Sequence, residues 1–310
     1  SIFDMTKAID LRAANKKAFD SLVYAGGLDS FKKVHRAQYL HEEGDGITFI
    51  EKALKFGSKF QENKNSAQVS LFENLTDLKF NEPDIPNCPK WSTLKSLKQE
   101  KEVVGIYISG HPLDDFKFPI KYFCNASLDF LNDLNSLLNK ELKIGGIVSE
   151  AEHKISKNGK GWARFVLEDY KDSYEFRIFG EEYLKYQHFL VENSFLYLRL
   201  VVREGWRDRE TGKTGEPRIT YLSFQQLQDA ISNNAQKLTI QLELREFNNE
   251  KVEDLKKIFK KHKGNQKLDI SFFESEEKIK LTMPSENFKI SINEDLLSAI
   301  EKKNYHFKLN

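Results

Sequence analysis

The chain has 310 residues, which is long enough for two or three domains that each bury a core. Its 48 Lys and Arg against 47 Asp and Glu leave a formal charge of +1, so nucleic-acid binding must depend on local patches. Two cysteines, and seven histidines without ligand spacing, predict no disulfide scaffold and no metal site. No apolar run approaches the roughly 20 residues of a membrane span, and we expect a cytoplasmic protein without a cofactor.

Residues 1–60 show helical periodicity in short pieces. One predicted helix stops at Gly26 and Gly27, and Asp29 or Ser30 is placed to cap the next helix. This outline predicts a helix-hairpin-helix. The glycine pair would let backbone N–H groups approach a DNA phosphate, and the alternative is a purely structural turn.

A polar stretch over residues 61–90 predicts a linker that contains one apolar pair. In an extended conformation Leu71 and Phe72 can enter a hydrophobic groove of a partner, while the Gln68 amide hydrogen-bonds upstream. Ser70 completes this candidate binding peptide. The alternative is that the apolar pair only fixes the linker to the protein's own core.

Residues 91–139 predict a helical connector. Apolar residues at helical spacing indicate a helix that ends at Gly105, and a short Leu-rich helix is predicted over residues 127–139.

Over residues 140–230 the apolar period changes to two, which indicates a sheet. Five strands with a helical segment between the third and the fourth match the five-stranded OB-fold β-barrel, and a generic five-stranded sandwich is the alternative. The strands are predicted to begin near residue 142 and to cover residues 162–167, 174–179, 195–202 and 218–224.

Residues 231–310 predict a small C-terminal α+β domain, so the fold class is multidomain α+β. Its first helix, over residues 250–262, is rich in lysine. An acidic partner surface, DNA phosphate and plain solubility all fit these lysines.

The loop after the first predicted strand is basic and lies next to an aromatic residue. Single-stranded DNA is bound by this combination, because bases stack on rings and cations neutralise phosphates. The candidate DNA-binding residues here are Lys154, Lys157, Lys160, Trp162 and Arg164.

The loop after the fourth predicted strand offers Trp206, Arg207 and Arg209, but acidic residues are interleaved with them. A solvated hairpin with internally paired charges is therefore an equal alternative. The Gly-Lys-Thr run at residues 212–214 lacks the upstream glycine of a phosphate loop, and we find no nucleophile and base pair. We predict no catalytic residue.

Four features occur in one order along the chain. Residues 22–31 read Leu-Val-Tyr-Ala-Gly-Gly-Leu-Asp-Ser-Phe, and residues 68–72 read Gln-Val-Ser-Leu-Phe. Residues 99–113 read Gln-Glu-Lys-Glu-Val-Val-Gly-Ile-Tyr-Ile-Ser-Gly-His-Pro-Leu, and the five predicted strands follow. Together they resemble the C-terminal portion of the bacterial DNA polymerase III alpha subunit family, by motif over residues 1–225 and by position beyond.

The resemblance implies a sliding-clamp (beta subunit) site at the Gln68 peptide and a barrel that binds single-stranded DNA. It also implies a terminal domain that contacts the tau subunit of the clamp loader, and it favours a protein partner for the basic helix. The polymerase active site would lie upstream, so we expect this stretch, which starts at Ser1 without methionine, to be a fragment that is not an enzyme. A stand-alone single-stranded nucleic-acid or tRNA-binding module is the alternative.

Overall fold

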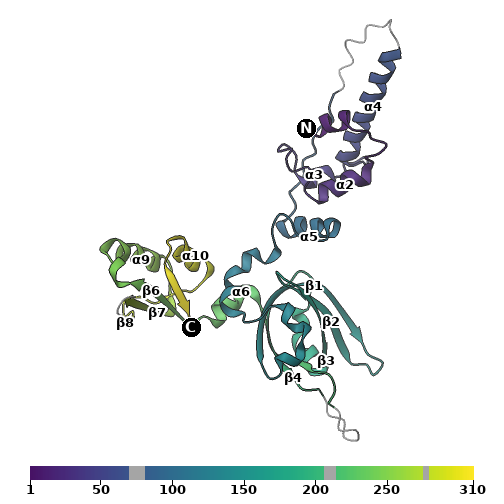
Figure 1. Cartoon of the computed structure of the whole chain (residues 1–310). Coiled ribbons are helices and arrows are strands. Elements are labelled where there is room, and N and C mark those ends of the chain that lie inside the picture. The colour runs from purple at the N-terminus through teal and green to yellow at the C-terminus, as the bar shows by residue number, and fades with distance from the viewer. Residues whose placement is uncertain (70–80, 206–213, 275–278) are drawn as a thin grey trace. The chain divides into compact units, whose positions relative to one another are not determined.

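The computed structural model describes residues 1–69, 81–205, 214–274 and 279–310, and only the backbone of residues 65–69 and 246. The described chain forms two compact units, Ser1–Pro112 and Leu113–Asn310. The first unit is helical and the second contains two sheets (Figure 1). The predicted mixed α+β class is confirmed.

Helices pack around one apolar core in the first unit, where Phe19, Val23, Tyr39 and Ile50 are fully buried. Asn15 caps the second helix, since its side chain accepts a hydrogen bond from the Ala18 N–H at 3.1 Å. The helices are α1 (Ile2–Ala8), α2 (Lys16–Tyr24), α3 (Arg36–Tyr39), α4 (Phe49–Val69) and α5 (Thr93–Val104).

The prediction that Asp29 or Ser30 caps the next helix is wrong. Turns follow α2, and α3 begins only at Arg36 with His35 in the cap position. The Asp29 carboxylate instead binds the Arg36 guanidinium, with Oδ2 2.6 Å from Nη2. A carboxylate held by this ion pair does not cap a helix.

Helix α4 runs past residue 61, where the sequence predicts the linker to begin, and continues to Val69. The Gln61 side chain donates hydrogen bonds to the carbonyl oxygens of Thr6 at 2.9 Å and Ile9 at 2.8 Å. These contacts anchor α4 on the end of α1, so the helix continues through a polar stretch without apolar periodicity.

In the second unit the segment predicted as one Leu-rich helix over residues 127–139 forms two short 3-10 helices. The Leu128 N–H donates to the Asp169 carboxylate at 2.7 Å, and Asp133 accepts from the Ser136 N–H at 3.4 Å. These side-chain bonds replace a continuous helical ladder. The connecting elements are η1 (Pro112–Phe116), α6 (Lys117–Phe123), η2 (Leu128–Asn132) and η3 (Leu134–Leu137).

The five predicted strands are confirmed and form one antiparallel sheet in the order β3-β2-β1-β4-β5. The predicted helical segment after β3 is also present. The bounds are β1 (Glu141–Ile155), β2 (Gly161–Glu168), β3 (Ser173–Phe179), α7 (Gly180–Tyr186), η4 (Gln187–Phe189), β4 (Phe195–Arg203) and β5 (Arg218–Gln226).

The sheet curls around its core but is not a closed barrel, because β3 and β5 are its two edges in the described chain (Figure 1). A side chain joins these edges: the Tyr221 hydroxyl donates to the Arg177 carbonyl oxygen at 3.0 Å. Within the described chain, β3 and β5 pair only with β2 and β4 and form no ladder with each other. The expected barrel closure is therefore not observed.

The C-terminal helix predicted over residues 250–262 is confirmed as the element Asn249–Lys261. Strand β6 pairs in parallel with β7, and the sheet order is β8-β7-β6-β9 with α9 and α10 on one side (Figure 1). The bounds are η5 (Leu227–Asp229), α8 (Ala230–Asn234), β6 (Lys237–Glu243), η6 (Leu244–Glu246), α9 (Asn249–Lys261), β7 (Lys263–Glu274), β8 (Ile279–Pro284), α10 (Glu294–Lys302) and β9 (His306–Leu309).

Candidate nucleic-acid interface

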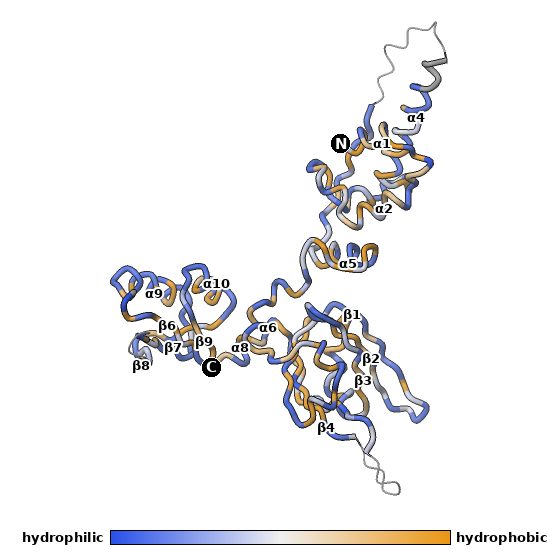
Figure 2. The backbone as a smooth tube through the Cα atoms, viewed as in Figure 1, coloured by the Kyte–Doolittle hydropathy of each residue, from blue (hydrophilic) through white to orange (hydrophobic). Residues whose placement is uncertain are grey.

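The hairpin of β1 and β2 carries half of the predicted DNA-binding residues, and its turn end is hydrophilic (Figure 2). Pairing ends at Ile155 and Gly161, and the Ser156 side chain accepts from the Lys160 N–H at 3.1 Å. Gly159 has a φ of +74°, a left-handed conformation that favours glycine. A Cβ on Gly161 would lie 2.5 Å from the Tyr183 ring, so glycine is also needed there.

The three predicted lysines of this hairpin have different surroundings. Lys157 and Lys160 are exposed on the turn, and within the described chain neither has a carboxylate in ion-pair range. Lys154 Nζ lies 2.7 Å from Glu152 Oε2 and 5.7 Å from the centre of the Trp162 ring. Lys157 and Lys160 are thus the cations that a phosphate can reach without displacing a carboxylate.

An aromatic pair lies on the outward face of β2 and β3. Trp162 stands opposite Phe179 in the strand register, with ring centroids 5.4 Å apart and an interplanar angle of 19°. Phe179 is 55% exposed. Rings stacked in this way offer a flat apolar surface next to the basic turn.

Sequence reasoning missed Phe179. The signal was present, because β3 alternates and Phe179 falls in phase with the exposed Glu175 and Arg177 rather than with the buried Phe176 and Ile178. An aromatic residue at an outward position of a strand is a candidate for base stacking.

Arg164 lies on the same face but is surrounded by carboxylates. Its guanidinium lies 2.7 Å from Glu175, 2.8 Å from Glu150 and 3.5 Å from Glu152. Hydrogen bonds from Arg164 and then Arg177 lower the pKa of Glu175. These acidic partners come from neighbouring strands, so a reading of the loop sequence alone does not reveal them, and a phosphate at Arg164 must compete with them.

The second predicted DNA-binding loop falls largely outside the described residues, as do Trp206, Arg207 and Arg209. Its base is described, where β4 and β5 end their pairing at Arg203 opposite Arg218. The candidate residues of this loop remain predictions.

Gly26 and Gly27 end helix α2. The Gly26 N–H donates to the Val23 carbonyl oxygen at 3.1 Å, and the Gly27 N–H donates to the Leu22 carbonyl oxygen at 2.8 Å. Gly26 has a φ of +78°, and a Cβ there would lie 2.1 Å from the Arg36 guanidinium. A phosphate would have to compete for donors that the helix end already uses, which supports the structural turn.

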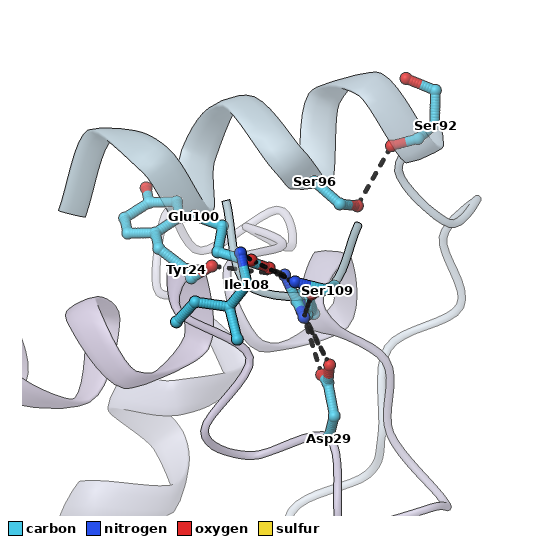
Figure 3. Close-up of polar contacts among 8 residues, drawn as sticks. Tyr24, Asp29, Ser92, Ser96, Glu100, Ile108 and Ser109 are labelled. Atoms are coloured by element: carbon cyan, nitrogen blue, oxygen red, sulfur yellow. Dashed lines mark hydrogen bonds and ion pairs between the residues drawn. The ribbon is translucent and has the colours of Figure 1, made fainter. Parts of the chain in front are cut away.

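The motif over residues 99–113 is organised around a carboxylate that the sequence did not single out (Figure 3). Glu100 is fully buried and accepts hydrogen bonds from the Ile108 N–H, from the Ser109 N–H at 2.6 Å and from the Ser109 hydroxyl. Arg36 Nη1 lies 3.2 Å from Glu100 Oε2. Burial raises the pKa of Glu100, but these hydrogen bonds and Arg36 outweigh it, so the pKa lies below its usual value.

Of the four predicted clamp-binding residues, only Gln68 lies within the described part of the chain. The backbone of Gln68 belongs to the end of α4, whereas Ser70, Leu71 and Phe72 lie outside the described residues. The peptide therefore remains a prediction.

Within residues 1–69, 81–205, 214–274 and 279–310, no helix is long and apolar enough to cross a membrane. No group of three or more His, Cys, Asp or Glu side chains in those ranges is arranged to hold a metal ion.

Sequence comparisons identify the kind of protein to which the chain is related. Residues 238–310 match the family model for the DNA polymerase III alpha subunit, C-terminal domain. DNA polymerase III subunit alpha of Mycobacterium tuberculosis is 24% identical over 86% of this chain and 22% of its own length. The subunit of Pseudomonas fluorescens is 24% identical over 96% and 25%, and that of Thermus aquaticus is 30% identical over 59% and 14%.

The chain is thus similar to large subunits of bacterial DNA polymerases, and it spans 14 to 25% of the length of these three relatives. Specifically, it is related to the C-terminal region of DNA polymerase III alpha subunits, and the resemblance predicted from its motifs is confirmed. A solved structure of RecG bound to a three-way DNA junction matches at 15% identity over 71% of this chain and 30% of its own. Its TM-score of 0.20 is too low to support a comparison of folds.

Proposed function

We propose that this chain is the noncatalytic C-terminal part of a cytoplasmic replicative DNA polymerase III alpha subunit, and that it binds single-stranded DNA on the outward face of β1 to β3. The main support is the stacked pair of the half-buried Trp162 and the exposed Phe179, together with the exposed turn residues Lys157 and Lys160, which have no carboxylate in ion-pair range within the described chain. Because every base has a flat face, ring stacking tolerates any template sequence.

We further propose that the five-stranded sheet is an OB-type fold and that residues 1–60 contain a helix-hairpin-helix. The strand order β3-β2-β1-β4-β5, with α7 between β3 and β4, supports the first assignment. In OB-folds the outer face of the second and third strands and the loops after the first and fourth strands bind oligonucleotides. Trp162, Phe179 and the lysine-bearing turn occupy the corresponding places on this sheet.

The energetic contributions on this face are unequal. A base stacked on an aromatic ring contributes about 1–3 kcal/mol, and each phosphate contact adds a term that falls with salt. Within the described chain, Lys157 and Lys160 can contact a phosphate without breaking an ion pair. Arg164 must first lose its carboxylate partners Glu150 and Glu175. We therefore propose that Arg164 mainly links neighbouring strands of the sheet and contributes less to phosphate binding.

In this proposal two further contacts retain the polymerase on its template. The peptide with Gln68, Ser70, Leu71 and Phe72 binds the sliding clamp, and the terminal domain binds the tau subunit of the clamp loader. Each contact is modest: burying a Leu or a Phe contributes about 1.5–3 kcal/mol, whereas a micromolar complex needs about 8 kcal/mol. Several weak contacts on one chain raise the effective concentration of each of them.

The second candidate is a stand-alone single-stranded nucleic-acid or tRNA-binding module. The same sheet face supports it. However, the relatives compared above are DNA polymerase subunits, and they match most of this chain. A pull-down with the purified clamp separates the two: retention of the wild-type chain supports the replication role, and its absence favours the stand-alone module.

The DNA-binding face is tested by titrating fluorescent oligo-dT with the full chain and with Phe179→Ala. We expect a loss of about 1–3 kcal/mol of binding free energy, which is at least a fivefold loss of affinity, because the most exposed ring of the stacked pair is removed. Phe130→Ala is the matched control, since Phe130 on η2 is 49% exposed against 55% for Phe179.

Lys157→Ala in the same titration should lower affinity and also reduce its salt dependence. Unchanged affinity of both Phe179→Ala and Lys157→Ala would exclude this face as the DNA site. Equal losses in the Phe130→Ala control would assign the effect to altered folding rather than to base stacking.

A further inference from the structure

The apolar face of the C-terminal sheet extends further than the two helices that cover it. Leu255 and Phe259 of α9 and residues of α10 pack on the β6 side of this face, where Leu238 and Ile240 are fully buried. Strand β8 continues the same face, because its residue Leu281 stands opposite Phe272 of β7 in the register. Ile279, Leu281 and Met283 therefore point to the covered side of the sheet.

These three side chains are left in solvent. Ile279 and Leu281 are each 56% exposed and Met283 is 44% exposed, and Phe247 after η6 is 41% exposed. A soluble domain has little reason to keep an apolar row on one face of an edge strand, because such strands promote aggregation. The row marks a surface that a binding partner covers.

Met283 of this row and Phe247 line a groove with a volume of about 340 Å³, and Leu281 lies next to Met283 on the same face of β8. Leu255 and Phe259 of α9 line the opposite wall, and Phe272 of β7 lines the floor. Among the lining residues that the structure describes, Lys256 is the one ionisable side chain. The groove is thus an apolar channel between a helix and an edge strand.

The charge at the rim is positive. From Lys256 to Lys263 the sequence contains five lysines and no acidic residue. Lys256 lines the groove and is paired with the exposed Glu253 at 2.9 Å, and the exposed Lys260 lies one helical turn further along α9. Glu274, which shares the apolar face, is already paired with Arg245 at 3.0 Å.

We propose that this groove binds an amphipathic helix of a partner protein, with apolar residues on one side and acidic residues along the flank that faces α9. A third helix beside α9 would bury Leu281, Met283 and Phe247 and place carboxylates near Lys256 and Lys260. An added strand at the β8 edge would pair its backbone but leave the apolar row in water. The apolar face therefore favours a helix over a strand.

The identity of the partner rests on the clamp-loader contact proposed above, whereas the geometry of the groove does not. The test uses the full chain and the purified tau subunit, with affinity measured by calorimetry. The variants are Leu281→Asp and Met283→Asp, and both positions are exposed enough to accept a charge in the free protein. Leu184→Asp, at a position on α7 that is 65% exposed, is the matched control.

We expect Leu281→Asp and Met283→Asp to weaken tau binding at least tenfold, and the control to stay within twofold of wild type. Lys256→Glu combined with Lys260→Glu should weaken binding at least threefold, with a larger effect at low salt. The melting temperature of each variant shows whether it remains folded.

Equal tau binding by wild type and both groove variants would overturn this inference and leave the clamp-loader contact in place. Absence of tau binding by the wild-type chain would remove that contact and the inference with it. If the lysine variant binds tau normally but loses affinity for oligo-dT, the basic flank serves nucleic acid and the acidic-helix proposal fails.

Discussion

At the scale of single residues, Glu100 shows how one buried carboxylate organises a segment. A charged group with no solvent exposure is expensive unless its oxygens are fully bonded, and both Glu100 oxygens are bonded here. Its donors are the backbone at residues 108 and 109, the Ser109 hydroxyl and the Arg36 guanidinium. Glu100 thereby fixes the chain after α5 onto Arg36 at the start of α3.

Glu100→Gln should destabilise the first unit by about 1.5–3 kcal/mol, since hydrogen bonds to a charged acceptor are lost and the amide NH₂ meets backbone donors. Urea unfolding followed by circular dichroism measures the change. Glu102→Gln, an exposed position on the same helix, serves as the control. A change no larger than that of the control would contradict the assigned role.

The same carboxylate predicts a pH dependence. Its pKa in the folded chain lies below the ordinary value of 4.5, so its stabilisation is full above that value and is lost as pH falls through the folded pKa. The difference in unfolding free energy between wild type and Glu100→Gln should be constant from pH 7 to about pH 5 and shrink in more acidic solution. A difference that grows on acidification would show that the pKa of Glu100 in the folded chain is raised and not lowered.

At the scale of elements, paired strands bring together charges that are far apart in the sequence. The first strand pair places Glu152 opposite Arg164, and the next places Arg164 opposite Arg177. The pKa of Glu152 is lowered first by Lys154, two residues away on the same strand, and then by Arg164 across the strand pair. A loop that reads as uniformly basic thus joins strands whose outward face is mixed.

The predicted clamp-binding peptide begins at the end of helix α4, which runs to Val69. We expect Leu71→Ala combined with Phe72→Ala to abolish retention on the sliding clamp, as both apolar anchors are lost. Oligo-dT affinity should stay within twofold of wild type. Clamp pull-down and oligonucleotide titration of the same preparation measure both effects, and equal loss of both would reject separate binding sites.

At the scale of the whole molecule, a formal charge of +1 means that long-range attraction does not bring this chain to DNA. In the proposed function, nucleic-acid affinity comes from the few cations at the β1–β2 turn and from stacking. The exposed lysines of α9 form a second positive region on the C-terminal sheet domain.

This charge distribution predicts weak salt dependence. With two or three phosphate contacts, the slope of log affinity against log salt for single-stranded DNA should lie near −1.4 to −2.1, at about −0.7 per contact. Oligo-dT titrations between 50 and 200 mM salt, roughly the range over which such slopes are measured, give the value directly. A slope steeper than about −4 would require a larger basic surface than the β1–β2 turn.

Local patterns in the sequence predicted most of the helices and strands. Alternation of apolar residues located all five strands of the first sheet, and the helix predicted over residues 250–262 corresponds to α9. The same patterns failed at residues 127–139, where Asp133 and Asp169 provide side-chain acceptors that compete with the helix. They also failed at the end of α4, which is held by contacts from Gln61 to the end of α1.

The sequence by itself determined the family relationship, the mixed α+β class and the lysine-rich turn, because motifs and periodicity are local properties of the chain. Only the tertiary structure brought Phe179 next to Trp162, surrounded Arg164 with carboxylates and buried Glu100 against Arg36. These contacts join residues on different strands or helices, and their partners depend on register and packing, which no single segment encodes.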